Sequence, residues 1–588
     1  MASSAQSQQL DDCLRLEDIE IGHVNGTSGA TRRLAEGIAH RTFTHPQQVT
    51  QLIQDGADPD SIPRLRVCGS DARGRPYRLL SLAVDNLSDG TLSTHKADSS
   101  GPPRPVRFPH WSSRELEADI INALIDGGAA INTPLIFDEW SLPIKVAVWC
   151  GNESAVRVLL ARGAAVRRHG MLAVMELPWS LYFTGRIVSP AYEERLLSIY
   201  RRLIRYDATL ATEQYLNGNL IHGAARSEGG SYSQAFIDSY LELLVNNGAS
   251  LTAVSGNYFT PLHEAASQGS PCVTDYLGRH LPAADINRGP TVNPNETPLV
   301  VAACNLYGLI QASQDVTEPQ DARDRAIRRM PPGEATIRIL LRSGADIGRM
   351  STATEQDRRC RQLVLPQCTT VLNDIHTGAM AAVNAALAPQ RSLAAFLMRS
   401  LPTLIPHLLQ PPGTPLVSPS PTALPAPNGY GPHEAEAIGW RIAAMCFDQD
   451  AANEAIAANI VIRHSDMARR VCAAVDHFIK SALYASSNRE VVGGTANVGG
   501  VTVRVPLQCF AIRADSRPHQ VVHTRGRVGV REVVQRARLA EAARHGIEEG
   551  AINKSFNDHL GNDDCQFGGW QQLGRIDERG QWVTLGIK

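Results

Sequence analysis

One stretch near the C-terminal end of the sequence carries side chains whose types and spacing suit a phosphate-containing ligand. Arg513, Asp515 and Arg517 alternate within residues 510–518 (FAIRADSRP). The planar guanidinium of arginine matches pairs of phosphate oxygens better than the point charge of lysine does. The alternative is an ordinary strand end at which Arg513 and Asp515 form a surface ion pair, which contributes little stability.

This segment resembles the first conserved strand of the cholera and pertussis toxin family of mono-ADP-ribosyltransferases, in which an apolar strand delivers an Arg-x-Asp-Ser-Arg-Pro motif. The match continues at three further positions, Val521, Val522 and Gly526. Residues 556–560 (FNDHL) and 564–566 (DCQ) are similar to the stretch that follows this strand in the pertussis toxin catalytic subunit.

The resemblance implies a function for each residue of the motif. NAD is the implied co-substrate, and Arg513 is the implied catalytic residue that anchors it. Asp515 and Arg517 are implied to bind the cofactor with Arg513 by shaping its pocket, and no metal is implied. The pyrophosphate of NAD is a suitable partner for an arginine side chain.

The catalytic glutamate of the family has no counterpart in this sequence. In the family it follows a second strand with a Ser-Thr-Ser motif, and it stabilises the positive charge that develops as the nicotinamide bond breaks. Residues 582–584 (WVT) are the only trace of that strand, and Glu548, Glu549 and Glu578 all precede it. We therefore assign no catalytic glutamate and expect residues 491–588 to form a partial, truncated transferase domain.

The segments around the motif show both strand and helix signals. Residues 501–505 (VTVRV) alternate as a strand does, and residues 530–550 contain good helix formers. Residues 434–490 have the periodicity of helices. Their apolar positions predict one buried stripe, formed by Ile438, Ile442, Met445, Ile456, Ile460, Val471, Val475 and Phe478.

The first 350 residues contain a repeated motif in which a helix end is followed by glycine and alanine. It occurs at residues 52–58, 124–129, 159–164, 243–249 and 340–346. A helix that ends in this way needs a residue that adopts a positive φ, after which the chain turns sharply. Repetition of such a unit predicts stacked helix pairs.

A complementary motif marks the start of a helix at residues 260–266 (TPLHEAA) and 297–303 (TPLVVAA), with weaker copies at 142–147 and 219–225. Thr caps the helix, Pro fits its first turn, and the alanine pair lets neighbouring helices approach. Both motifs resemble those of ankyrin repeats, whose period is about 33 residues. The resemblance implies protein binding, and we interpret the histidines of these motifs, His222 and His263, as hydrogen-bond donors that stabilise the repeat rather than as ligands or catalysts.

The combined patterns predict a mainly α protein with an ankyrin helical solenoid, a Pro-rich linker and a smaller α+β C-terminal domain. A generic helical bundle with chance Gly-Ala turns is the alternative. Insertions at residues 88–113 and 309–332 stretch the array. The expected order is a disordered polar N-terminus (1–30), an ankyrin-repeat array with insertions (31–350), a helical extension (351–410), a Pro-rich linker (411–433), a helical segment (434–490) and the transferase-like domain (491–588).

Composition argues against several functional classes. The formal net charge of −2 gives the molecule no electrostatic reason to bind nucleic acid or an anionic membrane. The 11 cysteines form no CxxC pair and no cluster with zinc spacing, so we expect reduced thiols that are mostly buried. No GxxxxGK[ST] loop or HExxH helix supports nucleotide hydrolysis or zinc proteolysis.

The N-terminal residues 1–10 are rich in Ser, Gln and Ala and lack the basic flank and apolar stretch of a Sec signal peptide. No window reaches the roughly 18 apolar residues of a membrane-spanning helix. We expect a protein that is cytoplasmic when made, or that is secreted into a host cell by a specialised system.

Three functions fit these observations. The first is a bacterial effector-like protein that binds a host protein and carries an NAD-dependent mono-ADP-ribosyltransferase domain. In the second, the transferase domain is degenerate and the protein acts by binding alone. The third is an ankyrin adaptor whose C-terminal region has no connection with NAD. In each of them the partner is a protein on the concave face of the array.

Overall fold

The structure of the 588-residue chain is a computed structural model, which divides into two compact units. Unit 1 contains residues 1–281 and 288–336, and unit 2 contains residues 282–287 and 337–588. The described residues are 13–24, 26–85, 95–99, 104–133, 142–168, 172–178, 188–215, 218–227, 232–408, 432–484, 495–498, 501–504, 510–513, 520–521, 530–553, 570–576 and 582–584.

Unit 1 is built from consecutive pairs of short helices. The pairs are α2 (Gly29–His40) with α3 (Pro46–Gln54), α4 (Leu79–Val84) with α5 (Arg114–Asp126), α6 (Pro143–Trp149) with α7 (Glu153–Ala161), α10 (Leu220–Ser227) with α11 (Gln234–Val245), and α12 (Pro261–Gln268) with α13 (Pro271–His280). Helix α9 (Pro190–Tyr206) lies between α7 and α11 in the chain, and α15 (Pro298–Gln314) leads into α16 (Gln320–Arg342), which crosses the boundary between the units.

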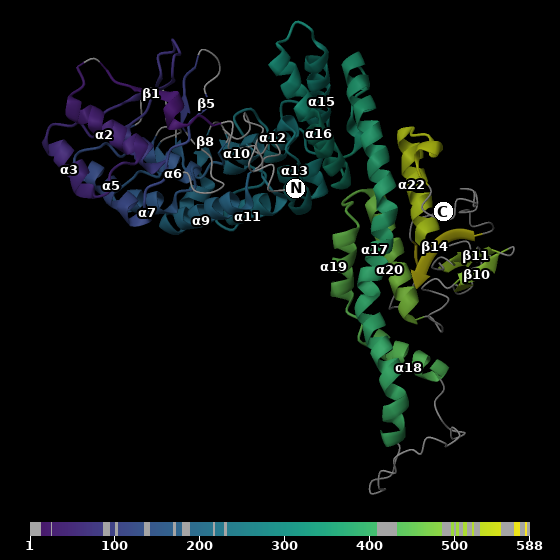
Figure 1. Cartoon of the computed structure of the whole chain (residues 1–588). Coiled ribbons are helices and arrows are strands. Elements are labelled where there is room, and N and C mark those ends of the chain that lie inside the picture. The colour runs from purple at the N-terminus through teal and green to yellow at the C-terminus, as the bar shows by residue number, and fades with distance from the viewer. Residues whose placement is uncertain are drawn as a thin grey trace. The chain divides into compact units, whose positions relative to one another are not determined.

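These helices form two layers. The first helices contact one another in the series α2, α4, α6 and again in α10, α12, α15, while the second helices α3, α5, α7, α9, α11 and α13 form one continuous series. Figure 1 shows α3, α5, α7, α9 and α11 following one another along one edge of the array. Each pair covers the apolar face of its neighbour, which is the ankyrin-type architecture that the repeated motifs predict.

The helix boundaries confirm both sequence motifs. The helices α6, α10, α12 and α15 begin inside the four predicted start motifs. After the five predicted ends, the chain turns at a glycine in the left-handed region, with φ of 90° at Gly56, 108° at Gly128, 80° at Gly163, 94° at Gly248 and 96° at Gly344. A side chain at any of these positions would strain the turn that leads to the next repeat.

Residues 172–178 lie inside the array without forming a helix. The side chains of Val174, Met175 and Leu177 are completely buried, and Tyr240 of α11 donates a hydrogen bond to the carbonyl oxygen of Met175 (2.9 Å). Lys145 of α6 forms a buried ion pair with Glu176 (Nζ to Oε2, 3.1 Å). The array therefore uses a buried polar contact where its regular helix packing is interrupted.

Short strands border the helix pairs. The first sheet joins β1 (Ile19–Gly22), β2 (Arg64–Val67) and β3 (Arg75–Pro76) in antiparallel order. Three two-stranded hairpins follow, formed by β4 (Lys96–Ala97) with β5 (Arg104–Pro105), β6 (Arg167–Arg168) with β7 (Leu172–Ala173), and β8 (Gln214–Tyr215) with β9 (Gly218–Asn219).

The two predicted insertions have different structures. Of residues 88–113, the parts 88–94 and 100–103 lie outside the described residues. Buried groups hold the first insertion, because His95 pairs with Asp85, and the guanidinium of Arg41 lies over the rings of Phe108 and Trp111 (5.6 and 4.7 Å to the ring centroids). Burial lowers the pKa of Arg41 to about 10. Residues 309–332 are helical extensions of α15 and α16, joined by a short turn.

Unit 2 is organised around α17 (Glu355–Leu408), a helix of 54 residues. It contacts α18 (Pro432–Met445), α19 (Gln449–Asn459), α20 (Asp466–Tyr484) and α22 (Val530–His545), which lie along it in Figure 1. The predicted buried stripe is confirmed at Val471, Val475 and Phe478, which are completely buried. It is wrong at Met445, which is 86% exposed because it is the last residue of α18.

Helix α22 is fixed to α17 by a buried arginine. Arg538 donates from Nε to the carbonyl oxygen of Leu372 (2.6 Å) and from Nη2 to the side-chain oxygen of Asn373 (2.9 Å). It also donates to Gln535 (2.7 Å) and Asn553 (2.7 Å). Burial lowers the pKa of Arg538 to about 10. All four of these acceptors are neutral, so hydrogen bonds rather than an ion pair offset the cost of burying the charge.

The C-terminal strands are all antiparallel. A hairpin joins β10 (Thr495–Val498) to β11 (Val501–Arg504), and a separate sheet has the order β13 (Gln520–Val521), β12 (Phe510–Arg513), β14 (Trp570–Ile576) and β15 (Trp582–Thr584). The strand predicted at residues 501–505 and the helix predicted within residues 530–550 are therefore both present.

The described residues contain free thiols and show neither a membrane-spanning helix nor a metal cluster. Within them, no helix is both long and apolar enough to cross a membrane, and no cluster of His, Cys, Asp or Glu could hold a metal ion. The cysteines there are free thiols. Of the nine described cysteines only Cys150, Cys360 and Cys368 are buried, while four are half-buried and Cys68 and Cys446 are exposed, so the prediction of mostly buried thiols is wrong for the described residues. The two exposed thiols follow the ends of β2 and α18, where no neighbouring element covers them.

Candidate functional site

Side-chain amides join successive repeats at the base of the loops that connect them. Asn132 donates from Nδ2 to the carbonyl oxygen of Gly163 (3.0 Å), and the amide of Ala165 donates back to Asn132 Oδ1 (2.7 Å). Asn287 donates in the same way to the carbonyl oxygen of Gly344 (2.9 Å). Each amide therefore ties one repeat to the backbone turn of the next.

The two histidines of the start motifs are buried and hydrogen-bonded, and their Nδ1 atoms accept hydrogen bonds where the sequence predicted donors. In α12, Nδ1 of His263 accepts a hydrogen bond from the backbone amide of Thr260 (3.3 Å), and Thr260 is the residue that caps the helix. In α10, Nδ1 of His222 accepts from the amide of Asn219 (3.1 Å), and Nε2 lies 3.1 Å from the carbonyl oxygen of Phe259 in the following loop. Burial lowers the pKa of both imidazoles to about 4, so the neutral ring is the folded form at neutral pH.

Two connecting loops of unit 1 present apolar side chains to solvent. We call residues 250–259 the first finger loop and residues 288–297 the second finger loop. Val254 and Tyr258 of the first are 49% and 52% exposed, and Val292 of the second is 66% exposed. The His263 ring, directly after the first finger loop, lies against the backbone of Arg288 in the second. Two consecutive finger loops therefore each expose large apolar side chains.

The first finger loop holds Tyr258 in an unusual conformation. Its φ of 63° lies in the left-handed region, which costs about 1 kcal/mol for a residue with a side chain. Two backbone hydrogen bonds fix the turn. The amide of Tyr258 donates to the carbonyl oxygen of Ser255 (2.9 Å), and the amide of Ser255 donates to the carbonyl oxygen of Phe259 (2.8 Å). The loop therefore presents the phenol ring on a fixed turn.

Charged groups lie on the first helices next to these loops. Arg226 of α10 and Glu264 of α12 form an ion pair of 3.8 Å, and their side chains are 28% and 12% exposed. The pair joins α10 to α12, the first helices of adjacent repeats, and Glu264 follows the last residue of the first finger loop by five residues.

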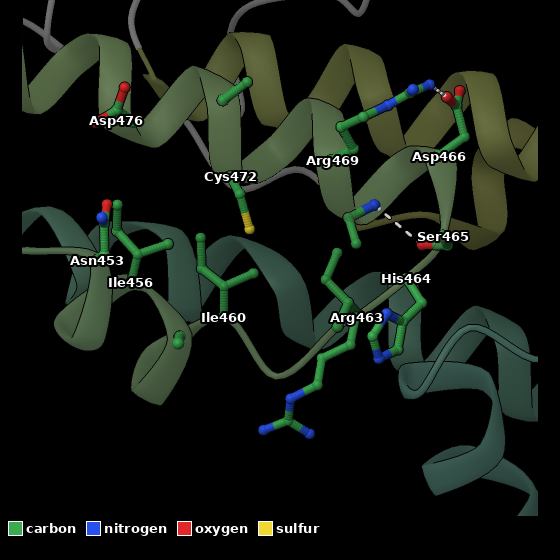
Figure 2. Close-up of a pocket in the computed structure, with 14 residues that line it drawn as sticks. Asn453, Ile456, Ile460, Arg463, His464, Ser465, Asp466, Arg469, Cys472 and Asp476 are labelled. Atoms are coloured by element: carbon green, nitrogen blue, oxygen red, sulfur yellow. Dashed lines mark hydrogen bonds and ion pairs between the residues drawn. The ribbon is translucent and has the colours of Figure 1, made fainter. Parts of the chain in front are cut away.

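A second candidate site is a groove of about 830 Å³ in unit 2, between α19 and α20. Its lining is apolar at Ile456, Ile460 and Ile462 and charged at Arg469 and Asp476. Figure 2 shows the Cys472 thiol pointing from α20 toward the isoleucines, while the Arg469 and Asp476 side chains project from the opposite side of α20. The groove thus combines an apolar floor with one edge that carries both charges.

The structure places only part of the transferase-like motif. Arg513 is the last residue of β12, at a register shift between β12 and β14, and its side chain is not described. Asp515 and Arg517 lie outside the described residues, as do residues 556–560 and 564–566. Residues 582–584 form β15, which pairs with β14. The proposed NAD-binding roles of Arg513, Asp515 and Arg517 therefore stay predictions.

Comparisons with known proteins gave similarities among solved structures. No protein-family model matches the chain, and no curated protein matches it. Among solved structures, the ankyrin repeat domain of human ASB11 is similar, with 17% sequence identity and a TM-score of 0.27, over 51% of this chain and 97% of that domain. The assignment of the fold here rests on the helix pairs, their caps and their stacking.

Sequence reasoning missed the exposed residues of the finger loops. Val254, Tyr258 and Val292 belong to no repeated motif, and only the conformation of each loop decides which of its side chains is exposed. Asn132 and Asn287, which tie successive repeats together, could have been recognised from the sequence. Each follows the repeat glycine or the equivalent turn by a few residues. A search for side chains at fixed positions after that turn would have found them.

Proposed function

We propose that this protein is a protein-binding adaptor whose ankyrin-type array recognises its partner through the two finger loops. The observation that carries the proposal is the exposure of Val254, Tyr258 and Val292 on consecutive loops. Large apolar groups that gather on a surface mark protein interaction sites, and tyrosine is enriched at such sites. The partner covers these three side chains.

The rigidity of the loops supports binding as their role. Helix caps and backbone turns already fix the first finger loop, so binding costs little of the entropy that a mobile loop would lose. The strained conformation of Tyr258 also indicates a function, because residues held in the left-handed region gather at binding sites.

A comparison of three full-length proteins tests this proposal. The finger variant carries Val254→Ser, Tyr258→Ser and Val292→Ser, and the control carries Val316→Ser, which removes an apolar side chain that is 82% exposed outside the finger loops. Proteins captured from a lysate by wild type are identified, and their affinity for each purified protein is measured by titration calorimetry. We expect the control to bind as wild type does and the finger variant to bind at least about tenfold more weakly. Equal affinity for all three proteins would exclude the finger loops as the binding site.

We propose a second function for the C-terminal segment, namely NAD-dependent mono-ADP-ribosylation of proteins that the array selects, as in a bacterial effector that acts on a host protein. The observation that favours it is the position of Arg513 at the end of a short strand that lies between β13 and β14. The motif resemblance requires an arginine at the end of an apolar strand. Arg513, Asp515 and Arg517 would then hold NAD.

Labelled NAD provides the test of this second function. Label transfer to protein and release of nicotinamide are measured for the full chain, for Arg513→Ala and for Arg504→Ala, a control that removes the arginine at the end of β11. Activity that is lost only with Arg513→Ala supports a transferase. No activity in a folded wild-type protein contradicts it and leaves the adaptor function alone.

A further inference from the structure

The last two turns of α9 carry a cluster of exposed cations in the layer of second helices. Arg201, Arg202 and Arg205 are exposed, and Tyr206, the last residue of the helix, is 55% exposed. We call these four residues the α9 patch. The opposite side of α9 is already used, because Tyr200 is completely buried. Figure 1 shows α9 between α7 and α11 along one edge of the array.

Within the described part of the chain, no carboxylate forms an ion pair with the three arginines of the α9 patch. Two acids of neighbouring second helices have other partners, since Asp126 of α5 pairs with Arg162 and Asp238 of α11 pairs with an arginine of α13. Asp207, directly after α9, pairs with Arg167 (3.1 Å), which adds a fourth guanidinium at this end of the helix. The positive charge of the α9 patch is therefore not balanced by these neighbouring acids.

Helix stability does not account for the α9 patch. A cation in the last turn of a helix is stabilised by the helix dipole, and Arg205 occupies that position in α9. Arg201 and Arg202 lie a turn earlier, where this effect has faded. Like charges one turn apart also repel, so Arg201 and Arg205 destabilise the isolated helix. A ligand of negative charge would offset this repulsion.

The side chains of the α9 patch suit carboxylates with an apolar neighbour. The planar guanidinium of arginine donates pairs of hydrogen bonds to a carboxylate. Arg205 Nε donates to the carbonyl oxygen of Arg201 (3.3 Å), which holds the side chain along the helix and leaves its Nη groups for a ligand. Arginine and tyrosine are both enriched at protein interfaces, and Tyr206 supplies the apolar contact.

The spacing of the α9 patch matches an extended chain. Arg201 and Arg205 are one turn apart, which is a rise of about 6 Å along the helix. Alternate side chains of an extended segment lie about 6.6 Å apart on one face. Acidic residues at alternate positions can therefore meet both arginines. Arg202 and Tyr206 form a second row with the same spacing, for a third carboxylate and an apolar side chain.

We propose that the α9 patch binds an extended acidic segment of a partner protein, with carboxylates at alternate positions. A nucleic acid fits less well, because a strong nucleic-acid binder neutralises about 6–10 phosphates, more than the α9 patch and Arg167 can contact. The α9 patch shares no residue with the finger loops. This second binding surface therefore goes beyond the adaptor function proposed for them.

Peptide selection on the full chain tests the proposal. Random peptides of about 12 residues, displayed on phage, are selected on wild type at about 50 mM salt, where exposed charges are weakly screened. We expect enrichment of peptides with acidic residues at alternate positions. The affinity of an enriched peptide, made with a fluorescent label, is then measured by anisotropy. The patch variant, with Arg201→Gln, Arg202→Gln and Arg205→Gln, should bind this peptide at least about tenfold more weakly.

A matched control removes the same charge elsewhere in unit 1. Arg32, Arg33 and Arg107 are also exposed, and none forms an ion pair within the described residues. The control variant with all three changed to glutamine should bind the peptide as wild type does. The finger variant should also bind it as wild type does, so failure of the finger-loop proposal and failure of this one are distinguishable. Circular dichroism checks that each variant is folded.

Each other outcome overturns the proposal. A selection that enriches no acidic peptide, or equal affinity for wild type and the patch variant, excludes the α9 patch as a binding site. A control variant that loses as much affinity as the patch variant would show only general charge attraction. A labelled thymidine oligonucleotide that binds wild type more tightly than the peptide, and that the patch variant no longer binds, would assign the α9 patch to nucleic acid instead.

Discussion

Acidification should destabilise the array through two imidazoles that the fold keeps neutral. His222 and His263 are completely buried, and burial lowers the pKa of each from 6.5 to about 4. Because the folded pKa is the lower one, the unfolded chain binds more protons between these values. The stability contributed by the neutral rings is fully present above pH 6.5 and is lost as the pH falls toward 4.

The size of the effect follows from the two pKa values. Each full pKa unit corresponds to about 1.4 kcal/mol, and at about pH 5 the unfolded imidazole is almost fully protonated while the folded one is not. A shift from 6.5 to about 4 then removes about 2 kcal/mol per histidine by that pH, or about 4 kcal/mol for both. Such a loss is a large part of the stability of an ordinary domain.

Urea unfolding followed by circular dichroism at about pH 7.5 and about pH 5 measures the effect. The combined variant His222→Gln and His263→Gln removes both titrating groups, so it should lose about 4 kcal/mol less than wild type over this range. His40→Gln is the control, because His40 is exposed at the end of α2. Equal losses for wild type and the combined variant would show that the fold does not hold these rings neutral, and the reasoning would be wrong.

Three further substitutions test the packing by urea unfolding at neutral pH. Lys145→Ala leaves Glu176 buried without its cation and should cost about 3–5 kcal/mol, and a loss below about 1 kcal/mol would contradict a buried ion pair. Arg538→Leu removes three hydrogen bonds between α22 and its neighbours, and a fourth to Gln535 within α22, and should cost about 2 kcal/mol, while no change would mean that α22 is held by its apolar face alone. Gly378→Ala places a Cβ against a backbone carbonyl and should cost about 1–3 kcal/mol, whereas Gly308→Ala, which meets nothing, should stabilise α15 by up to about 1 kcal/mol.

Local chemistry explains why so much of the array could be predicted. Thr260 and Pro261 define a helix start by capping and by a fixed φ, and Gly248 defines a helix end because it tolerates φ of 94°. These signals depend on neighbours in the chain, so one sequence is enough to recognise them. The interpretation of His222 and His263 as hydrogen-bonded groups of the repeat succeeded for the same reason, since each contacts the cap of its own helix.

Long-range packing explains what could not be predicted. Helix α17 continues through Pro366 and Pro389, although proline usually ends a helix, and the elements packed along it lie far away in the sequence. The exposure of Tyr258 depends on a turn that its own sequence does not specify. The groove between α19 and α20 requires both helices in place before its lining exists.

The buried contact between α22 and α17 has a consequence for synthesis of the chain. Arg538 reaches its partner, Leu372, only after 166 further residues have been added. At translation rates of about 5–20 residues per second, that interval is about 8–33 s. During this time the apolar face of α17 has left the ribosome without the helix that will cover it. The newly made protein therefore offers chaperones an apolar surface that disappears once α22 docks, and premature termination before α22 would leave that surface exposed to aggregation and proteolysis.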